Sequence, residues 1–220
     1  MSHDKLKPLV GAVILSGTLA IAGIEAGQPV LTAVFKPLAT TLLLFIVGWP
    51  THQYAWFVVA GILLSLVGDV ALLGDGALQF KIGLGAFLLA HVAYIVGSAR
   101  IGVFSRRVLV VAIIAIAATV LLLTKLWAGA ANMRVPILLY GAALTGMVVG
   151  SWSTLGSSLV WARFAAGGSV LFYVSDASLA LNRFHAPIPH EAFLSLGVYW
   201  LGQIGISLAA RGGLGERATA

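Results

Sequence analysis

Residues 65 to 95 read SLVGDVALLGDGALQFKIGLGAFLLAHVAYI, and the rest of the chain can be understood from this stretch. Its outer parts are apolar enough to lie in lipid, yet it contains Asp69, Asp75, Lys81 and His91. An ionisable side chain at membrane depth is energetically costly, so it usually faces a bundle interior or a wet cavity, where it marks a function. The stretch therefore predicts a membrane protein with a polar site inside a helix bundle.

The composition of the whole chain agrees with that prediction. Hydrophobic residues make up 60% of the 220 residues and charged residues 9%, whereas soluble domains contain about 25% charged residues. The mean hydropathy is +1.03. Each crossing needs roughly 20 apolar residues, so we expect an all-α polytopic membrane bundle of about eight transmembrane helices. It would form one domain over residues 1–210, followed by a polar tail over 211–220.

Apolar windows separated by Pro, Gly or charged breaks predict where the helices lie. The predicted spans are 6–24, 30–48, 54–74, 80–98, 107–124, 134–152, 159–181 and 191–210. An even number of spans places both termini on one side of the membrane. More Lys and Arg residues fall on that side than on the other, so we expect cytoplasmic termini in a cell membrane. In this topology Lys36, Asp69 and Asp176 lie in the half of the bilayer away from the termini, which predicts a pocket opening there.

Several classes of function lack support in the sequence. The chain has no cysteine, which excludes disulfides, thiolate nucleophiles and Cys-ligated metals and leaves oxygen and imidazole groups for any chemistry. It also has no HExxH, GxSxG, GxGxxG or Walker A motif, so zincin, serine-esterase and nucleotide-binding interpretations are not indicated. The net charge of +6 comes from scattered basic residues, which is typical of lipid contact rather than of nucleic-acid binding.

Three pairs of similar segments, in the same order along the chain, indicate an internal repeat. Copies of four helices each would run parallel, with a site at their interface, and Asp69 and Asp176 would be equivalent residues. Chance similarity between apolar helices is the alternative. The paired segments are KP (36–37) with RVP (134–136), VGDVAL (67–72) with VSDASL (174–179), and GAFLLAH (85–91) with GVYWLGQ (197–203).

The strongest candidates for catalysis are Asp69 and Asp176, each late in an apolar span. Of two carboxyl groups in an apolar site, one can act as an acid while the other accepts a proton. The alternative is that each ends a helix or forms a salt bridge, for example with Lys81 or Arg183. His91 is predicted near the middle of the membrane, where an imidazole without partners would be costly.

Other residues are candidates for binding. Lys36, Lys81 and Arg183 could hold a phosphate at the mouth of the pocket, although basic side chains at a membrane interface also extend towards water without any ligand. Asp69, His91 and Asp176 could ligate a metal, but their spacing requires neither a metal nor a cofactor, and we predict none. The candidates for the pocket wall are Tyr94, Tyr140, Tyr173, Tyr199 and Gln203.

A set of short motifs runs in order through nearly the whole chain. They are FKPL (35–38), SLVGD (65–69), FKIGL (80–84), HVAYI (91–95), FYVSDASLA (172–180) and YWLGQ (199–203). With these motifs the chain resembles the YhhN-like lysoplasmalogenases, a family of small eight-helix membrane hydrolases. The resemblance implies hydrolysis of the vinyl ether bond of lysoplasmalogens, which yields a fatty aldehyde and glycerophosphoethanolamine or glycerophosphocholine. It also implies that Asp69 and Asp176 are catalytic and that His91 is the histidine of the fourth helix.

The function expected from the resemblance is an Asp-based general acid/base hydrolase of lipid metabolism. Its partners would be a lysophospholipid substrate and the lipid bilayer, without nucleic acid, and the glycine-rich helix faces permit a homodimer without requiring one. Two other classes stay open from the residues alone. One is a metal-assisted intramembrane lipid amidase or esterase, and the other is a proton-coupled transporter of small molecules.

Overall fold

The computed structural model describes residues 6 to 214, which are helical over most of their length and contain no β-strand. Residues 1–5 and 215–220 lie outside the described residues. They include most of the predicted polar tail and two of the basic residues on the side of the termini, Lys5 and Arg217. The helices are α1 (Leu6–Glu25), α2 (Pro29–Val47), α3 (Gln53–Ala71), α4 (Ala77–Ala99), α5 (Arg106–Ala130), α6 (Arg134–Ser153), α7 (Ala162–Phe184) and α8 (Val198–Gly212). A π-helical turn, Phe193–Gly197, leads into α8.

The helices are those of a multi-pass membrane protein. Among residues 6–214, 7 continuous helical stretches are long and apolar enough to cross a membrane, and the longest, Arg106–Gly156, contains both α5 and α6. Only helices or closed barrels can satisfy all backbone hydrogen bonds within lipid. The prediction of an all-α polytopic membrane bundle is therefore confirmed.

Tertiary contacts set where some helices end. α5 continues to Ala130, past the predicted position 124, because Leu126 and Ala130 are buried together with Ile137 at the start of α6. α3 ends at Ala71, and the connection to α4 that follows it contains the exposed Asp75.

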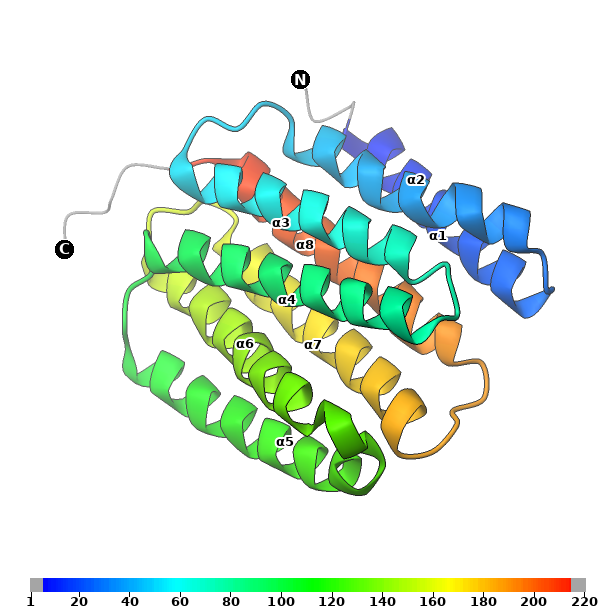
Figure 1. Ribbon diagram of the computed structural model, residues 1–220. Coiled ribbons are helices and arrows are strands. Elements are labelled where there is room, and N and C mark those ends of the chain that lie inside the picture. The colour runs from blue at the N-terminus through cyan, green and yellow to red at the C-terminus, as the bar shows by residue number, and fades with distance from the viewer. Residues whose placement is uncertain (1–5, 215–220) are drawn as a thin grey trace.

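The helices pack in a closed circuit, in the order α2, α3, α4, α6, α7, α8 and back to α2. α1 packs on the outside against α2 and α8, while α5 packs against α6 and α7, so the two pairs α1/α2 and α5/α6 lie at opposite sides of the bundle (Figure 1). α3 packs most extensively against α4, and α7 packs most extensively against α8. The start of α1 and the end of α8 lie at the same end of the bundle (Figure 1).

Glycine allows α7 and α8 to approach closely. A Cβ atom at Gly202 of α8 would lie 2.7 Å from the carbonyl oxygen of Gly168 in α7. A side chain does not fit there without moving the backbones apart. Small residues serve this role in many membrane helix pairs, and here they bring the polar face of α8 into the bundle interior.

Candidate active site

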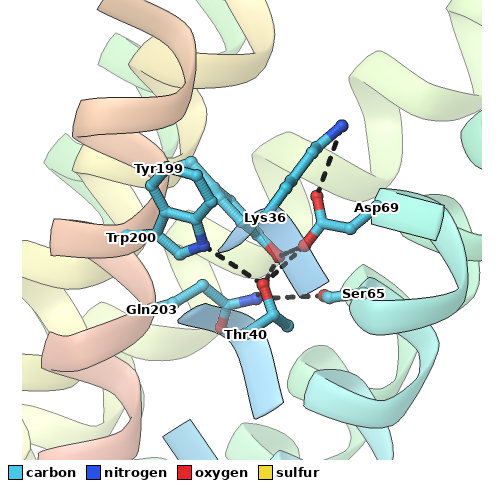
Figure 2. A network of polar contacts seen from close by, with 7 residues as sticks. All are labelled: Lys36, Thr40, Ser65, Asp69, Tyr199, Trp200 and Gln203. Atoms are coloured by element: carbon cyan, nitrogen blue, oxygen red, sulfur yellow. Dashed lines mark hydrogen bonds and ion pairs between the residues drawn. The ribbon is translucent and has the colours of Figure 1, made fainter. Parts of the chain in front are cut away.

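Asp69, near the end of α3, is enclosed by hydrogen-bond donors. Its side chain is 1% exposed. The hydroxyls of Thr40 and Tyr199 donate to its Oδ2 atom over 2.5 and 3.0 Å. The ammonium group of Lys36 lies 3.9 Å from its Oδ1 atom (Figure 2). Two hydroxyl donors and a buried cation are the contacts that a charged carboxylate needs inside a protein.

The network around Asp69 extends from α2 and α3 to α8 (Figure 2) and, through Tyr94, to α4. The indole Nε1 of Trp200 donates to the Thr40 hydroxyl over 3.1 Å. The amide nitrogen of Gln203 donates to Ser65 over 3.0 Å, and its amide oxygen accepts from Tyr94 over 2.8 Å. The network therefore joins α2, α3, α4 and α8 and leaves few buried polar groups without a partner.

Helical spacing explains how the network assembles. Lys36 and Thr40 are four residues apart on α2, and so are Tyr199 and Gln203 on α8. Residues at this spacing share one face of a helix. The polar face of α2 and the polar face of α8 thus meet at Asp69.

Asp176, on α7, has different surroundings. It is 8% exposed, and its Oδ2 atom lies 2.9 Å from Nε2 of His91 and accepts a hydrogen bond from the Tyr140 hydroxyl over 2.6 Å. Its Oδ1 atom has no hydrogen-bond partner among residues 6–214. His91 is fully buried, and its Nδ1 atom also has no partner in the described part of the chain. The carboxyl group is therefore anchored by one oxygen, and the other oxygen remains available.

A cavity adjoins Asp176 between α4, α5, α6 and α7. The space in it that the centre of a water molecule can reach is about 50 Å³, several times what one water needs. The guanidinium group of Arg183 lies 4.9 Å above the ring of Phe80, and both residues border the cavity. Its polar lining residues are Thr119, Tyr140, Tyr173, Asp176 and Arg183, and the others are apolar, among them Leu84, Phe87, Leu122, Ile137 and Phe184.

Aromatic rings separate the two aspartates. The ring centroid of Phe172 lies 4.9 Å from that of His91 and 5.1 Å from that of Tyr199. No hydrogen bond among residues 6–214 links the two clusters. The clusters are neighbours on either side of an aromatic layer.

The predicted site residues fall into three groups. Tyr94, Tyr199, Gln203 and Lys36 surround Asp69, with Lys36 only 5% exposed and away from the cavity. A second group, His91 and Tyr140, holds Asp176, while Tyr173 and Arg183 border its cavity. Lys81 is exposed and borders a separate groove between α4 and α6, to which Tyr140 and Leu84 also contribute.

Several residues of the site were not predicted. Thr40 could have been found from its position one turn after Lys36. Neutral residues in an apolar helix carry no comparable signal, and only the packing of α3, α5, α6, α7 and α8 brings them to the site. They are Ser65, Thr119, Thr145, Phe172 and Trp200.

No cluster of three or more His, Asp, Glu or Cys side chains that could hold a metal occurs among residues 6–214. Asp69 faces Lys36, and Asp176 faces a single histidine.

Comparisons with known proteins place this chain among named relatives. The YhhN family matches residues 31–210. The lysoplasmalogenase TMEM86B of Mus musculus is 27% identical over 190 residues, which cover 85% of this chain and 79% of the relative. The lysoplasmalogenase TMEM86A of Homo sapiens is 29% identical over 166 residues, covering 72% and 67%. The lysoplasmalogenase of Mycobacterium tuberculosis is 31% identical over 183 residues, covering 79% and 67%. No solved structure matches the chain.

Proposed function

The chain belongs to the YhhN family, and on this premise we propose that it is a membrane lysoplasmalogenase. It would hydrolyse the vinyl ether bond of a lysoplasmalogen to a fatty aldehyde and glycerophosphoethanolamine or glycerophosphocholine. The observation that carries the proposal is the Asp176 carboxyl group, which borders a cavity and is anchored through Oδ2 alone. The relatives named as lysoplasmalogenases support the choice of substrate.

The reaction needs an acid and then a base at one place. A proton is added to the alkene carbon further from the ether oxygen, and the carbon bonded to that oxygen becomes part of an oxocarbenium ion. Water adds to this carbon and loses a proton, which gives a hemiacetal. The hemiacetal breaks its bond to the glycerol oxygen, which takes up a proton, and the aldehyde is released. Proton transfer by a positioned side chain contributes roughly 10²–10⁴-fold to such a rate.

We assign both proton transfers to Asp176. Its protonated carboxyl group donates from Oδ1 to the alkene carbon, and the resulting carboxylate stabilises the adjacent cation and takes the proton from water. His91, bound to Oδ2, exchanges a proton with the carboxyl group and holds its orientation. Tyr140 donates to the same oxygen and stabilises the carboxylate form.

Asp69 has an indirect role in this proposal. It does not border the cavity, and its oxygens are engaged by Thr40, Tyr199 and Lys36. Tyr199 packs against Phe172, whose ring also contacts His91. Asp69 thus positions the aromatic layer behind the reacting group, whereas Asp176 carries out the proton transfers.

The basic residue best placed for the substrate phosphate is Arg183. It borders the cavity about two turns beyond Asp176 on α7, a distance of about 10 Å along the helix. Arginine binds phosphate through paired hydrogen bonds. With cytoplasmic termini in the cell membrane, the cavity would receive its substrate from the opposite leaflet.

The test is to incubate the purified protein with a lysoplasmalogen and with its saturated ether analogue, and to measure aldehyde release. Cleavage of the vinyl ether alone is the expected result, because only the alkene carbon can accept the proton. If neither compound is cleaved, the proposed function fails. If the saturated ether is cleaved as well, protonation of the alkene is not the mechanism.

A further inference from the structure

A second apolar hollow lies next to the cavity at Asp176. It is a groove on α5, α6 and α7 in which the centre of a water molecule can reach about 270 Å³. Its lining contains no charged residue, and part of it, such as Ile114 and Val170, is exposed on the face that would meet lipid. The lining residues are Val111, Ile114, Ala115, Ala118, Val148, Trp152, Val170 and Tyr173.

The groove adjoins the cavity at α7. Tyr173 borders both hollows. Arg183 and Asp176, seven residues apart, share one face of α7, and from Asp176 the side chains of Tyr173 and Val170 follow at three-residue intervals that wind around the helix. Val170 lies about 9 Å along the helix from Asp176. A cation, a carboxyl group and an apolar groove therefore follow one another along α7 and partly around it.

This order matches the order of groups in a one-chain ether phospholipid: phosphate, vinyl ether and hydrocarbon chain. We propose that the groove binds the alkenyl chain of the substrate, with the chain passing Tyr173. The inference rests on the proposed function, since it takes the vinyl ether to lie beside Asp176. The cavity itself, at about 50 Å³, is too small for a long chain, so the chain must leave it along an apolar route.

The junction between the two hollows is held by hydroxyl groups. Thr119 of α5 lies 2.9 Å from the Tyr173 hydroxyl and 2.7 Å from the Thr145 hydroxyl of α6. These bonds tie α5 to α6 and α7 where the chain would pass. Tyr173 thus acts as the residue that determines specificity for chain length. An alkenyl chain that ends before Tyr173 does not need the groove, whereas a longer alkenyl chain does.

Chain-length preference tests the inference. Ala118→Phe and Val170→Phe would fill the groove, and the neighbouring exposed positions outside the groove supply the controls Ala117→Phe and Val174→Phe. The substrates are lysoplasmalogens with a butenyl or a hexadecenyl chain, and the measured quantity is kcat/KM for aldehyde release from each. Both groove variants are expected to lose roughly tenfold or more on the hexadecenyl substrate alone, as blocked apolar pockets do. The controls are expected to match the wild type on both.

The other outcomes separate the two proposals. If wild type cleaves both substrates and the groove variants keep the wild-type ratio between them, the chain lies elsewhere and the groove inference is overturned while the proposed function stands. If wild type cleaves neither substrate, the proposed function has failed and the inference fails with it.

A second measurement does not depend on activity. A saturated ether analogue with a diazirine at the end of a hexadecyl chain is photolysed on the wild-type protein in detergent, and labelled peptides are identified by mass spectrometry. Labelling between Val111 and Ala118 and around Val170, reduced by excess lysoplasmalogen, is expected. Labelling that is spread over α1 to α4, or that excess lysoplasmalogen does not reduce, would show general lipid contact only and overturn the inference.

Discussion

The clusters around Asp69 and Asp176 have similar hydrogen-bonding partners but differ in their access to the cavity. Each carboxyl group accepts a hydroxyl donor from the helix that precedes its own, Thr40 on α2 for Asp69 and Tyr140 on α6 for Asp176. Each also meets a side chain from the other half of the chain, Tyr199 on α8 in the first case and His91 on α4 in the second. Yet the first cluster is closed around a cation, and the second is open to a cavity.

The difference follows from helix packing. α3 packs directly against α8, which leaves room around Asp69 for hydrogen-bonding side chains only. Between α4 and α7 lies the cavity, lined by Phe80, Leu84 and Phe87 on one side and by Asp176 on the other. If the two halves are repeats, as the paired segments predict, then one copy of the site has become an anchor and the other has kept the space that a reaction needs.

The substitution with the largest expected effect is Asp176→Asn. The amide cannot supply the proton, so aldehyde release should fall roughly a thousandfold. Its shape is nearly unchanged, so thermal unfolding in detergent should move little. Asp75→Asn, in the exposed turn after α3, is the matched control and should match the wild type. Full activity in Asp176→Asn would show that the open carboxyl group is not the acid and would end the proposed division of roles.

The next largest effect is expected for Asp69→Asn, and it should appear in stability. Removing the carboxylate leaves Lys36 as a buried cation without its partner, a change that typically costs about 3–5 kcal/mol. The midpoint of thermal unfolding in detergent should therefore fall well below that of Asp176→Asn. A fall in activity that exceeds the loss of folded protein would instead mean that Asp69 takes part directly in the chemistry.

A double variant sharpens this prediction. Lys36→Met combined with Asp69→Leu removes both charges, and apolar replacement of a buried ion pair is often neutral or stabilising. The double variant should therefore recover most of the stability that Asp69→Asn loses. An unfolding midpoint as low as in the single variant would show that Thr40 and Tyr199 depend on the carboxylate more than the ion pair does.

The fold class could be predicted from the sequence because lipid imposes a simple rule. A segment that crosses the bilayer must be apolar and must satisfy its own backbone, so hydropathy alone reveals the bundle. The ends of helices follow less simple causes. The last turn of α5 is stabilised by Leu126 and Ala130 against Ile137 and Phe184, and contacts of this kind depend on residues that are distant along the chain.

The ionisable residues of the site could be predicted from the sequence. Which of them contact one another could not. Asp69, His91 and Asp176 stand out because ionisable groups are rare in an apolar chain. Which of them meet is decided by the packing of α3 against α8 and by the space between α4 and α7. Lys36 illustrates the limit, since its sequence position is equally compatible with a phosphate site and with the ion pair that it forms.

The smallest effects are expected for two phenol groups that occupy comparable places in the two clusters. Tyr140→Phe removes one hydrogen bond to Asp176, and Tyr199→Phe removes one to Asp69. A hydrogen bond to a charged group is worth about 1.5–3 kcal/mol. In the open cluster this should lower the rate of aldehyde release about tenfold or more with little change in unfolding, because the carboxylate formed after proton donation loses a donor.

In the closed cluster the same deletion should act mainly on stability, since Asp69 keeps Thr40 and Lys36 as partners but Gln203 loses the Tyr199 hydroxyl as an acceptor. Comparing the two variants by initial rate and unfolding midpoint therefore tests the contrast between the clusters at the scale of one oxygen atom. If Tyr140→Phe and Tyr199→Phe changed both quantities equally, the two clusters would be functionally equivalent. Asp69 would then take part in the reaction as directly as Asp176, and access to the cavity would not separate the functions of the two clusters.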